Sequence, residues 1–397
     1  MRFPLLARVI IAIILGIVIG QFLPLDGVRL FATFNGIFGQ FLSFIVPLII
    51  VGLVTPAIAD IGKGAGKVLI IAVLIAYIDT IIAGLLAYGV GTVTFPSIIA
   101  SVTGTHIDKY EAIDPFFSIS IPAMIDVMSA LVFSFMMGVC TAYGGHRTMK
   151  ALFDEFRQII VKTIEKAIVP LLPLYIFGIF LMMTSSGQVY HILKVFALII
   201  LIIFVLHLFI LLYEFIIAGI VVKKNPFRML YNMLPAYFTA LGTSSSAATI
   251  PVTLRQTKKN GVPESIADFT IPLCATIHMS GSAMKITACA LTICLLNGIP
   301  YDFGSFIHFV MMLGIIMVAA PGVPGGAIMA ALAPLASILG FDGESQALMI
   351  ALYIAMDSFG TACNVTGDGA IAAVVGKFFG KQVGKQQHSD TEKQVNS

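Results

Sequence analysis

The chain has 397 residues, of which 58% are hydrophobic and 11% are charged, and its formal net charge is +3. Soluble domains carry about 25% charged residues, so the composition excludes a water-exposed globular protein and predicts a polytopic membrane protein. The small net charge does not favour a nucleic-acid-binding protein. The five cysteines lack CxxC or metal-type spacing, so they do not indicate a zinc or disulfide framework.

Apolar stretches long enough to cross a bilayer as helices follow one another along the chain. They occupy residues 5–24, 34–60, 66–96, 116–143, 158–185, 191–222, 263–297 and 345–378. The first resembles a signal peptide but is longer and has no small-residue cleavage site, so we interpret it as a membrane helix. Two more apolar stretches, 226–257 and 303–340, are each interrupted near the middle.

The interruptions are a serine-rich turn at 242–251 and a Pro/Gly-rich turn at 320–326. Inside hydrocarbon, non-helical backbone would leave polar groups unpaired, so it is tolerated only where protein encloses it or water reaches it. Paired broken segments are typical of the midplane ligand site of transporters. The predicted fold class is therefore all-α, with eight transmembrane helices and two re-entrant helical hairpins.

Basic residues gather beside alternate loops, near 63–67, 147–157, 223–228, 255–259 and 377–385. This bias predicts that these loops and both termini are cytoplasmic. The two hairpins then enter from opposite sides, as inverted repeats would. The polar tail at 381–397 is predicted to be disordered.

Three segments resemble the signatures of the dicarboxylate/amino acid:cation symporters, which include glutamate transporters and neutral amino acid exchangers. They are GTSSSAATIPVT at 242–253, APGVPGGA at 320–327 and NVTGD at 364–368. The resemblance covers nearly the whole chain and implies a homotrimer with elevator-type alternating access. It also implies scaffold helices at 1–65 and 116–190, and transport segments at 66–115 and 191–380.

Polar residues of the last apolar stretch, Asp357, Thr361, Asn364 and Asp368, are spaced to share one helical face. Charged residues at mid-bilayer are costly and usually functional, although a purely structural role for these carboxylates is the alternative. The resemblance implies substrate contacts at Ser244, Ser245, Ser246, Val323, Pro324, Gly325, Asp357, Gly360, Thr361 and Asn364. It implies sodium ligands at Thr276, His278, Met279, Asn364 and Asp368, with Asp357 binding the substrate amino group.

Gly360 departs from the family pattern, because members that carry acidic substrates have an arginine there. A second substrate carboxylate would lack a partner, and Gly360 leaves free volume. The sequence therefore predicts a small neutral amino acid, similar to serine, threonine or alanine. The alternative is an acidic amino acid or dicarboxylate that uses Lys285 or protonated His278 as its cation.

The segment His278-Met279-Ser280-Gly281-Ser282 departs too, since the family usually has an aspartate where Ser280 stands. One sodium site is therefore expected to be absent. Asp79 and Lys285 are hypothesised to pair instead, the alternative being that Lys285 reaches an interface. His278 either makes transport proton-sensitive or is a neutral structural imidazole.

A hydrolase built from the serine turn, His278 and Asp357 is disfavoured, because the Gly-x-Ser-x-Gly turn is missing. A channel would not need Asp357 or a second hairpin. The sequence thus predicts a sodium-coupled symporter in the cell membrane, in contact with lipid, that binds no nucleic acid and is not an enzyme.

Overall fold

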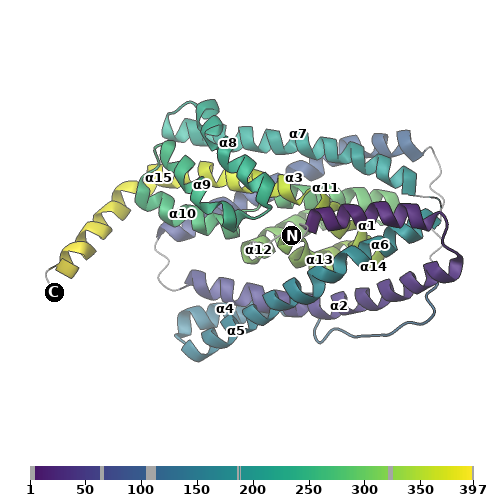
Figure 1. Cartoon of the computed structure of the whole chain (residues 1–397). Helices are drawn as coiled ribbons and strands as arrows, with labels where there is room; N and C mark the ends of the chain where they lie inside the picture. Colours follow the sequence, from purple (N-terminus) through teal and green to yellow (C-terminus); the bar gives the residue numbers. More distant parts are fainter. Residues whose placement is uncertain are drawn as a thin grey trace.

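The computed structural model describes residues 5–62, 67–103, 113–185, 187, 189–320 and 325–395, and every regular element in this part is helical. The helices of the first half are α1 (Leu5–Gly20), α2 (Leu25–Gly62), α3 (Lys67–Thr103), α4 (Val127–Gly144), α5 (Arg147–Thr163), the π-helical turn η1 (Ile164–Ile168), α6 (Val169–Ser185) and α7 (Val189–Val222). Those of the second half are α8 (Pro226–Thr243), α9 (Ser246–Lys259), α10 (Glu264–Ile277), α11 (Ser280–Asn297), α12 (Phe303–Ala319), α13 (Gly326–Leu339), α14 (Gly343–Ala355) and α15 (Asp357–Val395) (Figure 1). The predicted all-α class is confirmed.

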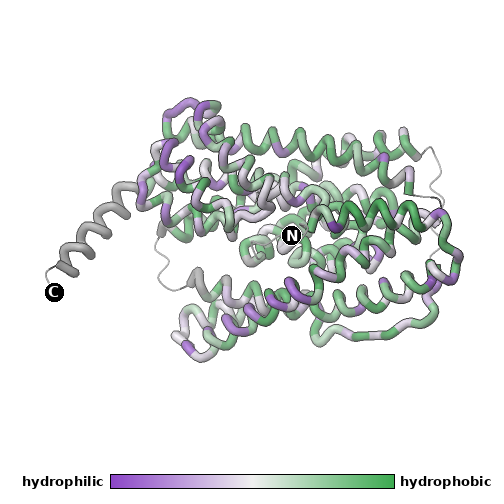
Figure 2. The backbone as a smooth tube through the Cα atoms, viewed as in Figure 1, coloured by the Kyte–Doolittle hydropathy of each residue, from purple (hydrophilic) through white to green (hydrophobic). Residues whose placement is uncertain are grey.

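The length and apolar character of the helices fit a multi-pass membrane protein. Within the described ranges, five helical stretches are long and apolar enough to span a bilayer, and the bent pair α14 and α15 makes a sixth. Apolar residues predominate along the helices, and polar residues gather near helix ends and on α5 (Figure 2). Eight spans, inverted repeats and the opposite entry of two hairpins remain predictions.

Three breaks between consecutive helices bring non-helical backbone into the interior. Ser244 and Ser245 separate α8 from α9, and His278 and Met279 separate α10 from α11. Met356 alone separates α14 from α15, which are bent by 62°. The last two breaks interrupt stretches that appear continuous in the apolar pattern of the sequence. Each break frees backbone N–H groups at the start of the next helix, and these can bind side chains or ligands.

The centre of the second half is α11, in which every residue from Ser280 to Cys294 is buried. It packs against α3, α7, α14 and α15, while α15 also packs against α8, α9 and α10. On the other side of the molecule, α2 packs with α4, α5 and α6, and α1 packs with α6 (Figure 1). A polar side chain on α11 is therefore surrounded by other helices, and it must find its partners among them.

Two segments differ from the predicted elements. Residues 113–126 are non-helical, so the fourth helix begins at Val127 rather than at 116, with Asp126 as its N-cap. Pro115 and Pro122 explain this, because proline disfavours a helical residue before it and lacks the helical N–H. At the other end, α15 continues to Val395, where the sequence predicts a disordered tail. Lysine, glutamine and glutamate in this tail have good helix propensity.

Candidate functional site

The polar face of α15 points toward α11 and the α10–α11 break. Asp357, Thr361, Asn364 and Asp368 all lie in α15 and are buried. Asp357 lies at the N-terminus of the helix, whereas Asp368 is three turns further along. The predicted shared face is therefore present, and its two carboxylates meet different partners.

Asp357 is bound by a cation that belongs to the protein itself. The Lys285 Nζ lies 3.3 Å from Asp357 Oδ1, and the Gly325 N–H donates to Asp357 Oδ2 at 2.9 Å. Lys285 is fully buried, donates to the Met356 carbonyl at 3.3 Å, and lies 3.6 Å from the centre of the Tyr353 ring. Because Asp357 also begins α15, the helix dipole favours its negative charge. The carboxylate is thus compensated without a substrate.

Lys285 also fills the space beside Gly360. A Cβ atom built on Gly360 would lie 2.7 Å from Lys285 Nζ and 2.9 Å from Lys285 Cε. The expectation that Gly360 leaves free volume is therefore wrong. The ammonium lies where a side chain at position 360 would begin. The hypothesis that Lys285 pairs with Asp79 is also wrong, since each has a different partner.

The serine-rich turn closes onto the start of α15. Ser244 adopts a left-handed conformation with φ of 50°, and its Oγ lies 2.6 Å from Ser358 Oγ. Ser245 caps α9 by accepting the Ala248 N–H at 3.3 Å, and Ser246 is the first, buried residue of that helix. The structure therefore brings this turn near Asp357. Val323 and Pro324 lie outside the described residues, whereas Gly325 is described.

Asn364 joins α15 to the start of α11. Its Oδ1 accepts the N–H groups of Gly281 at 2.9 Å and Ser282 at 3.3 Å, and its amide donates to Ser282 Oγ at 3.0 Å. These backbone groups are the ones that the α10–α11 break leaves free, so Asn364 acts as a cap from another helix. Thr361 instead donates to the carbonyl of Asp357 within α15, at 2.9 Å.

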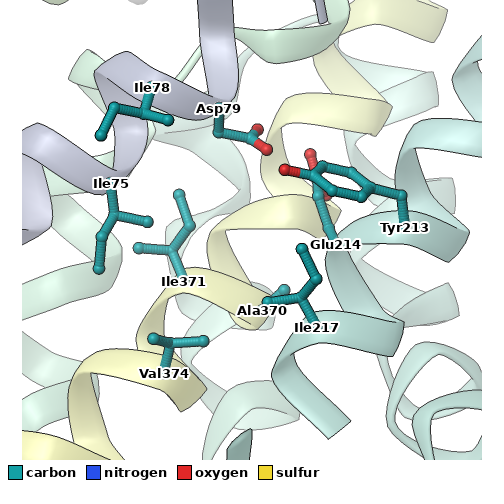
Figure 3. A pocket seen from close by; sticks show the side chains of 9 residues that line it. All are labelled: Ile75, Ile78, Asp79, Tyr213, Glu214, Ile217, Ala370, Ile371 and Val374. Carbon is teal, nitrogen blue, oxygen red and sulfur yellow. The ribbon is translucent and has the colours of Figure 1, made fainter. Parts of the chain in front are cut away.

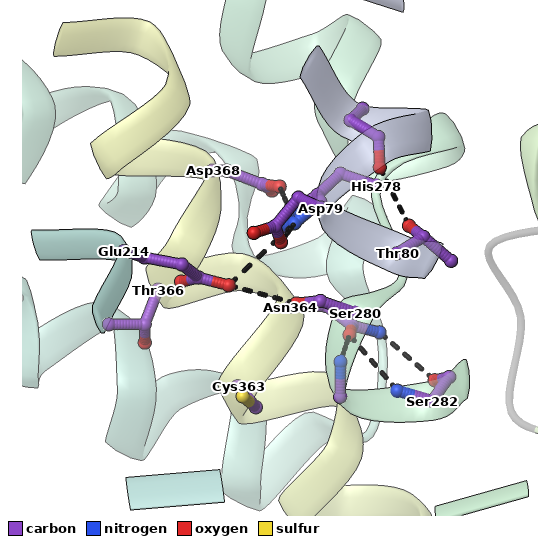
Figure 4. Close-up of polar contacts among 12 residues, drawn as sticks. Asp79, Thr80, Glu214, His278, Ser280, Ser282, Cys363, Asn364, Thr366 and Asp368 are labelled. Atoms are coloured by element: carbon purple, nitrogen blue, oxygen red, sulfur yellow. Dashed lines mark hydrogen bonds and ion pairs between the residues drawn. The ribbon is translucent and has the colours of Figure 1, made fainter. Parts of the chain in front are cut away.

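His278, in the same break, is enclosed by acidic side chains (Figure 4). Its Nδ1 lies 2.9 Å from Asp368 Oδ1, and its Nε2 lies 2.9 Å from Asp79 Oδ2 and 3.9 Å from Glu214 Oε1. Ser280 donates its hydroxyl to Glu214 Oε1 at 3.0 Å. Four chain segments thus meet around one imidazole.

The predicted sodium ligands are engaged in other contacts. Asp368 Oδ1 bonds to His278, and Asn364 Oδ1 accepts two backbone N–H groups. Thr276 is exposed and donates to the Leu273 carbonyl at 2.8 Å, while the buried Met279 separates α10 from α11. The assignment of these five residues as sodium ligands, with Thr276 and Met279 offering their backbone carbonyls, stays a prediction.

Sequence reasoning missed Glu214 as a member of the His278 cluster. The seven-residue spacing of His207 and Glu214 suggests a pair, but His207 Nε2 instead lies 3.1 Å from the Gly281 carbonyl oxygen. A signal was available, since a carboxylate at mid-bilayer needs a partner. The partner is on another helix, which a spacing along one chain segment does not reveal. Tyr353 and Ser358, which contact Lys285 and Ser244, could not be singled out from the sequence, because neither is a charged residue in an apolar stretch.

Comparison with known proteins decides the family, because the model of the sodium:dicarboxylate symporter family matches residues 5–378. The chain belongs to this family. The resemblance of the three signature segments is thereby confirmed. The family consists of symporters, and the apolar helices are those of a multi-pass membrane protein.

Among curated relatives, the mouse (Mus musculus) excitatory amino acid transporter 3 is 35% identical over 178 residues, which is 45% of this chain and 33% of that protein. The human (Homo sapiens) excitatory amino acid transporter 2 is 33% identical over 161 residues, covering 40% and 28%. The rat (Rattus norvegicus) excitatory amino acid transporter 1 is 28% identical over 253 residues, covering 63% and 46%. The matched region thus spans about a third to a half of these relatives.

Proposed function

We propose that this chain is a cation-coupled symporter for a small dicarboxylate, with or without an amino group, and that Lys285 supplies the positive charge that recognises the substrate. The observation that carries the proposal is the position of the Lys285 ammonium, 3.3 Å from Asp357 and 2.7 Å from the Cβ position of Gly360. The names of the excitatory amino acid transporters, as relatives, also favour an acidic substrate.

The electrostatic argument for a neutral substrate depends on the absence of a cation near position 360. Lys285 removes that premise, because a second substrate carboxylate has a buried ammonium to bind and is not left unpaired. Asp357 and Lys285 together carry no net charge, as an aspartate and an arginine would. Since Asp357 is already compensated, an amino group on the substrate is not required.

The turn at Ser244 to Ser246 offers a binding position for the substrate carboxylate that Lys285 does not bind. The first residues of α9 present backbone N–H groups and the positive end of the helix dipole close to the start of α15. A dicarboxylate bound between this turn and Lys285 has a donor for each end. Gly325, whose N–H already reaches Asp357, belongs to the second turn that would cover the substrate.

A neutral amino acid is the second candidate. Lys285 already bonds to Asp357 and Met356 and lies over Tyr353, so it is engaged without any substrate. In that case Lys285 would stay on Asp357 and the substrate would meet no free cation.

The proposal includes sodium as the driving ion, elevator-type alternating access, assembly as a homotrimer, and a position in the cell membrane with both termini cytoplasmic. Family membership supports sodium coupling. The placement of basic residues beside alternate loops supports the orientation.

Uptake into proteoliposomes tests the substrate. The purified protein is reconstituted, and accumulation of labelled succinate, aspartate and serine is measured with and without an inward sodium gradient. The proposal expects gradient-dependent accumulation of succinate or aspartate and no accumulation of serine. Accumulation of serine without either dicarboxylate would contradict it and would favour the neutral amino acid.

A further inference from the structure

Three membrane spans of the second half end beside charged segments. The span Leu193–Val222 ends directly before Lys223, and the span Glu264–Asn297 begins five residues after Lys259. The bent pair of α14 and α15 ends at Phe379. Since an apolar span ends where hydrocarbon gives way to lipid headgroups and water, each of these ends lies at a membrane surface.

Side-chain contacts join the three ends into one surface. Lys224, after α7, donates to the Asn260 carbonyl, after α9, at 2.7 Å. The Asn260 amide donates to the Met229 carbonyl in the first turn of α8 at 3.0 Å. A Cβ atom on Gly376 of α15 would lie 3.2 Å from Pro263 Cδ. The α7–α8 turn, the α9–α10 turn and α15 therefore lie side by side at this end (Figure 1).

The helices α7 and α15 also face each other just inside this end. Ile217 of α7 and Val374 of α15 line the same cavity of about 160 Å³ (Figure 3). Ile217 precedes Lys223 by six residues, and Val374 precedes Lys377 by three. At 1.5 Å per helical residue, alkyl side chains thus begin less than about 10 Å below the lysines. The lysines belong to the border of the apolar layer.

The surface is strongly basic. It exposes six basic side chains, those of Lys223, Lys224, Arg228, Arg255, Lys259 and Lys377. The acidic residues of the described segments 219–232, 251–268 and 373–379 are Glu264 and Asp268, and both pair with Lys258, at 2.7 and 2.9 Å. The six exposed cations therefore give this end a positive potential that attracts anions.

Aromatic side chains lie among these cations. Phe227, Tyr231 and Phe378 are 63%, 70% and 61% exposed. The first two are one turn apart in α8, with Arg228 between them along the chain. Phe378 directly follows Lys377. Exposed rings beside basic residues are typical of protein that sits at the headgroup level of a bilayer, whereas a site for a soluble anion has no use for them.

We propose that this surface binds the headgroups of anionic phospholipids, with Lys223, Arg228 and Lys259 as cations and Phe227 and Tyr231 placed among the headgroups. Each lysine or arginine close to a bilayer surface strengthens the attraction to anionic lipid by about fivefold. Bound lipid would tie the α7–α8 turn, the α9–α10 turn and α15 to one leaflet.

The lipid surface is distant from the proposed substrate site. Lys377 follows Asp357 by 20 residues in α15, which is about 30 Å along the helix axis. Lipid binding can therefore be measured without substrate, and its outcome does not depend on which substrate the protein carries.

Tryptophan fluorescence in proteoliposomes tests this surface, because the native chain contains no tryptophan. Tyr231→Trp places one reporter at the surface. Phe303→Trp, at a position that is 62% exposed at the start of α12, places another beyond the opposite end of the α10–α11 span. Quenching by brominated phosphatidylglycerol and by brominated phosphatidylcholine is compared at equal mole fraction. We expect phosphatidylglycerol to be preferred more than tenfold at the Tyr231→Trp reporter and not at the Phe303→Trp reporter.

Neutral variants test the cations. With the Tyr231→Trp reporter, Lys223→Gln, Arg228→Gln and Lys259→Gln should each lower the preference by up to about fivefold, and the three together should abolish it. Lys194→Gln, at the other end of α7, should leave it unchanged. The Phe303→Trp reporter in the triple variant should keep its native quenching, which separates lost lipid binding from misfolding.

Two results would overturn the proposal directly: equal quenching by both lipids at the Tyr231→Trp reporter, or a preference that survives the triple variant. Soluble glycerol phosphate distinguishes the lipid from a free phosphate ester. At matched ionic strength, it should reduce the preference no more than NaCl does, since screening alone acts on both. A specific loss of the preference with glycerol phosphate would assign the surface to a soluble anion and would contradict the lipid.

Discussion

Lys285 and Asp357 form an ion pair that is enclosed by the protein, with side-chain exposures of 0% and 9% and a distance of 3.3 Å between Nζ and Oδ1. Lys285 comes from the second turn of the buried helix α11, and Asp357 from the first turn of α15. Because the pair joins the two helices beside the Ser244 turn, its charges affect both the stability of the protein and the choice of substrate that it binds.

Removing the cation alone should destabilise the protein. Lys285→Met leaves the Asp357 carboxylate buried without its partner, and we expect a loss of about 3–5 kcal/mol in the free energy of unfolding. Denaturant unfolding in detergent measures it. The double variant Lys285→Met with Asp357→Asn should regain much of the loss, because no buried charge is left.

Lys258→Met is the matched control for that series. Lys258 has two carboxylate partners, Glu264 and Asp268, but its ion pairs lie at the surface, where water solvates the charges. We expect little change in unfolding. If both lysine variants lost the same free energy of unfolding, burial of the Lys285–Asp357 pair would not explain the loss.

Gly360→Ala tests how closely Lys285 packs. The added methyl group would lie 2.7 Å from Nζ, so the ammonium must move away from Asp357, at a cost of about 1–3 kcal/mol. Dicarboxylate uptake should fall with it. Gly89→Ala in α3, where the new methyl group meets open space, should leave uptake close to native. Equal effects of the two changes would contradict the packing.

Asn364→Ala should destabilise the α10–α11 break. The substitution leaves the N–H groups of Gly281 and Ser282 without their acceptor, and each buried group that stays unpaired costs about 1–3 kcal/mol. Asn297→Ala, which removes one partly buried hydrogen bond to Ser345, should cost less. Hydrogen exchange at the start of α11 would show whether the loss is local, and unchanged exchange there would argue against the capping role.

Two glycines of α15 allow a test of the His278 cluster by size alone. A methyl group on Gly367 would meet Glu214 Oε2 and lie 2.8 Å from His278 Cε1, and both side chains are fixed by other bonds. A methyl group on Gly369 would meet the flexible end of Met233. Gly367→Ala should therefore lower the unfolding temperature more than Gly369→Ala. The reverse order would show that the cluster is easily deformed.

The shared polar face of α15 could be predicted from the sequence. The spacing of Asp357, Thr361, Asn364 and Asp368 places them on one face of any helix that they form. The sequence also marks the serine turn, where Ser244 and Ser245 separate two helices as predicted. Periodicity along one segment supports both predictions.

The pairing of the charges could not be derived in the same way. Lys285 could reach Asp79 or Asp357, depending on how α11 is rotated and shifted against α3 and α15, and the packing of several helices sets that register. The breaks at His278 and Met356 are equally hidden, since the flanking residues stay apolar. They become necessary only once Asn364 and Lys285 are seen to use the freed backbone groups.

Moving the positive charge from Lys285 to position 360 tests the central claim most directly. Lys285→Ala makes room for a side chain on Gly360, and adding Gly360→Arg returns a cation to the same space. We expect dicarboxylate uptake in proteoliposomes to fall more than tenfold in Lys285→Ala and to recover in large part in the double variant. Native dicarboxylate uptake by folded Lys285→Ala, or serine uptake that is indifferent to both changes, would contradict the account.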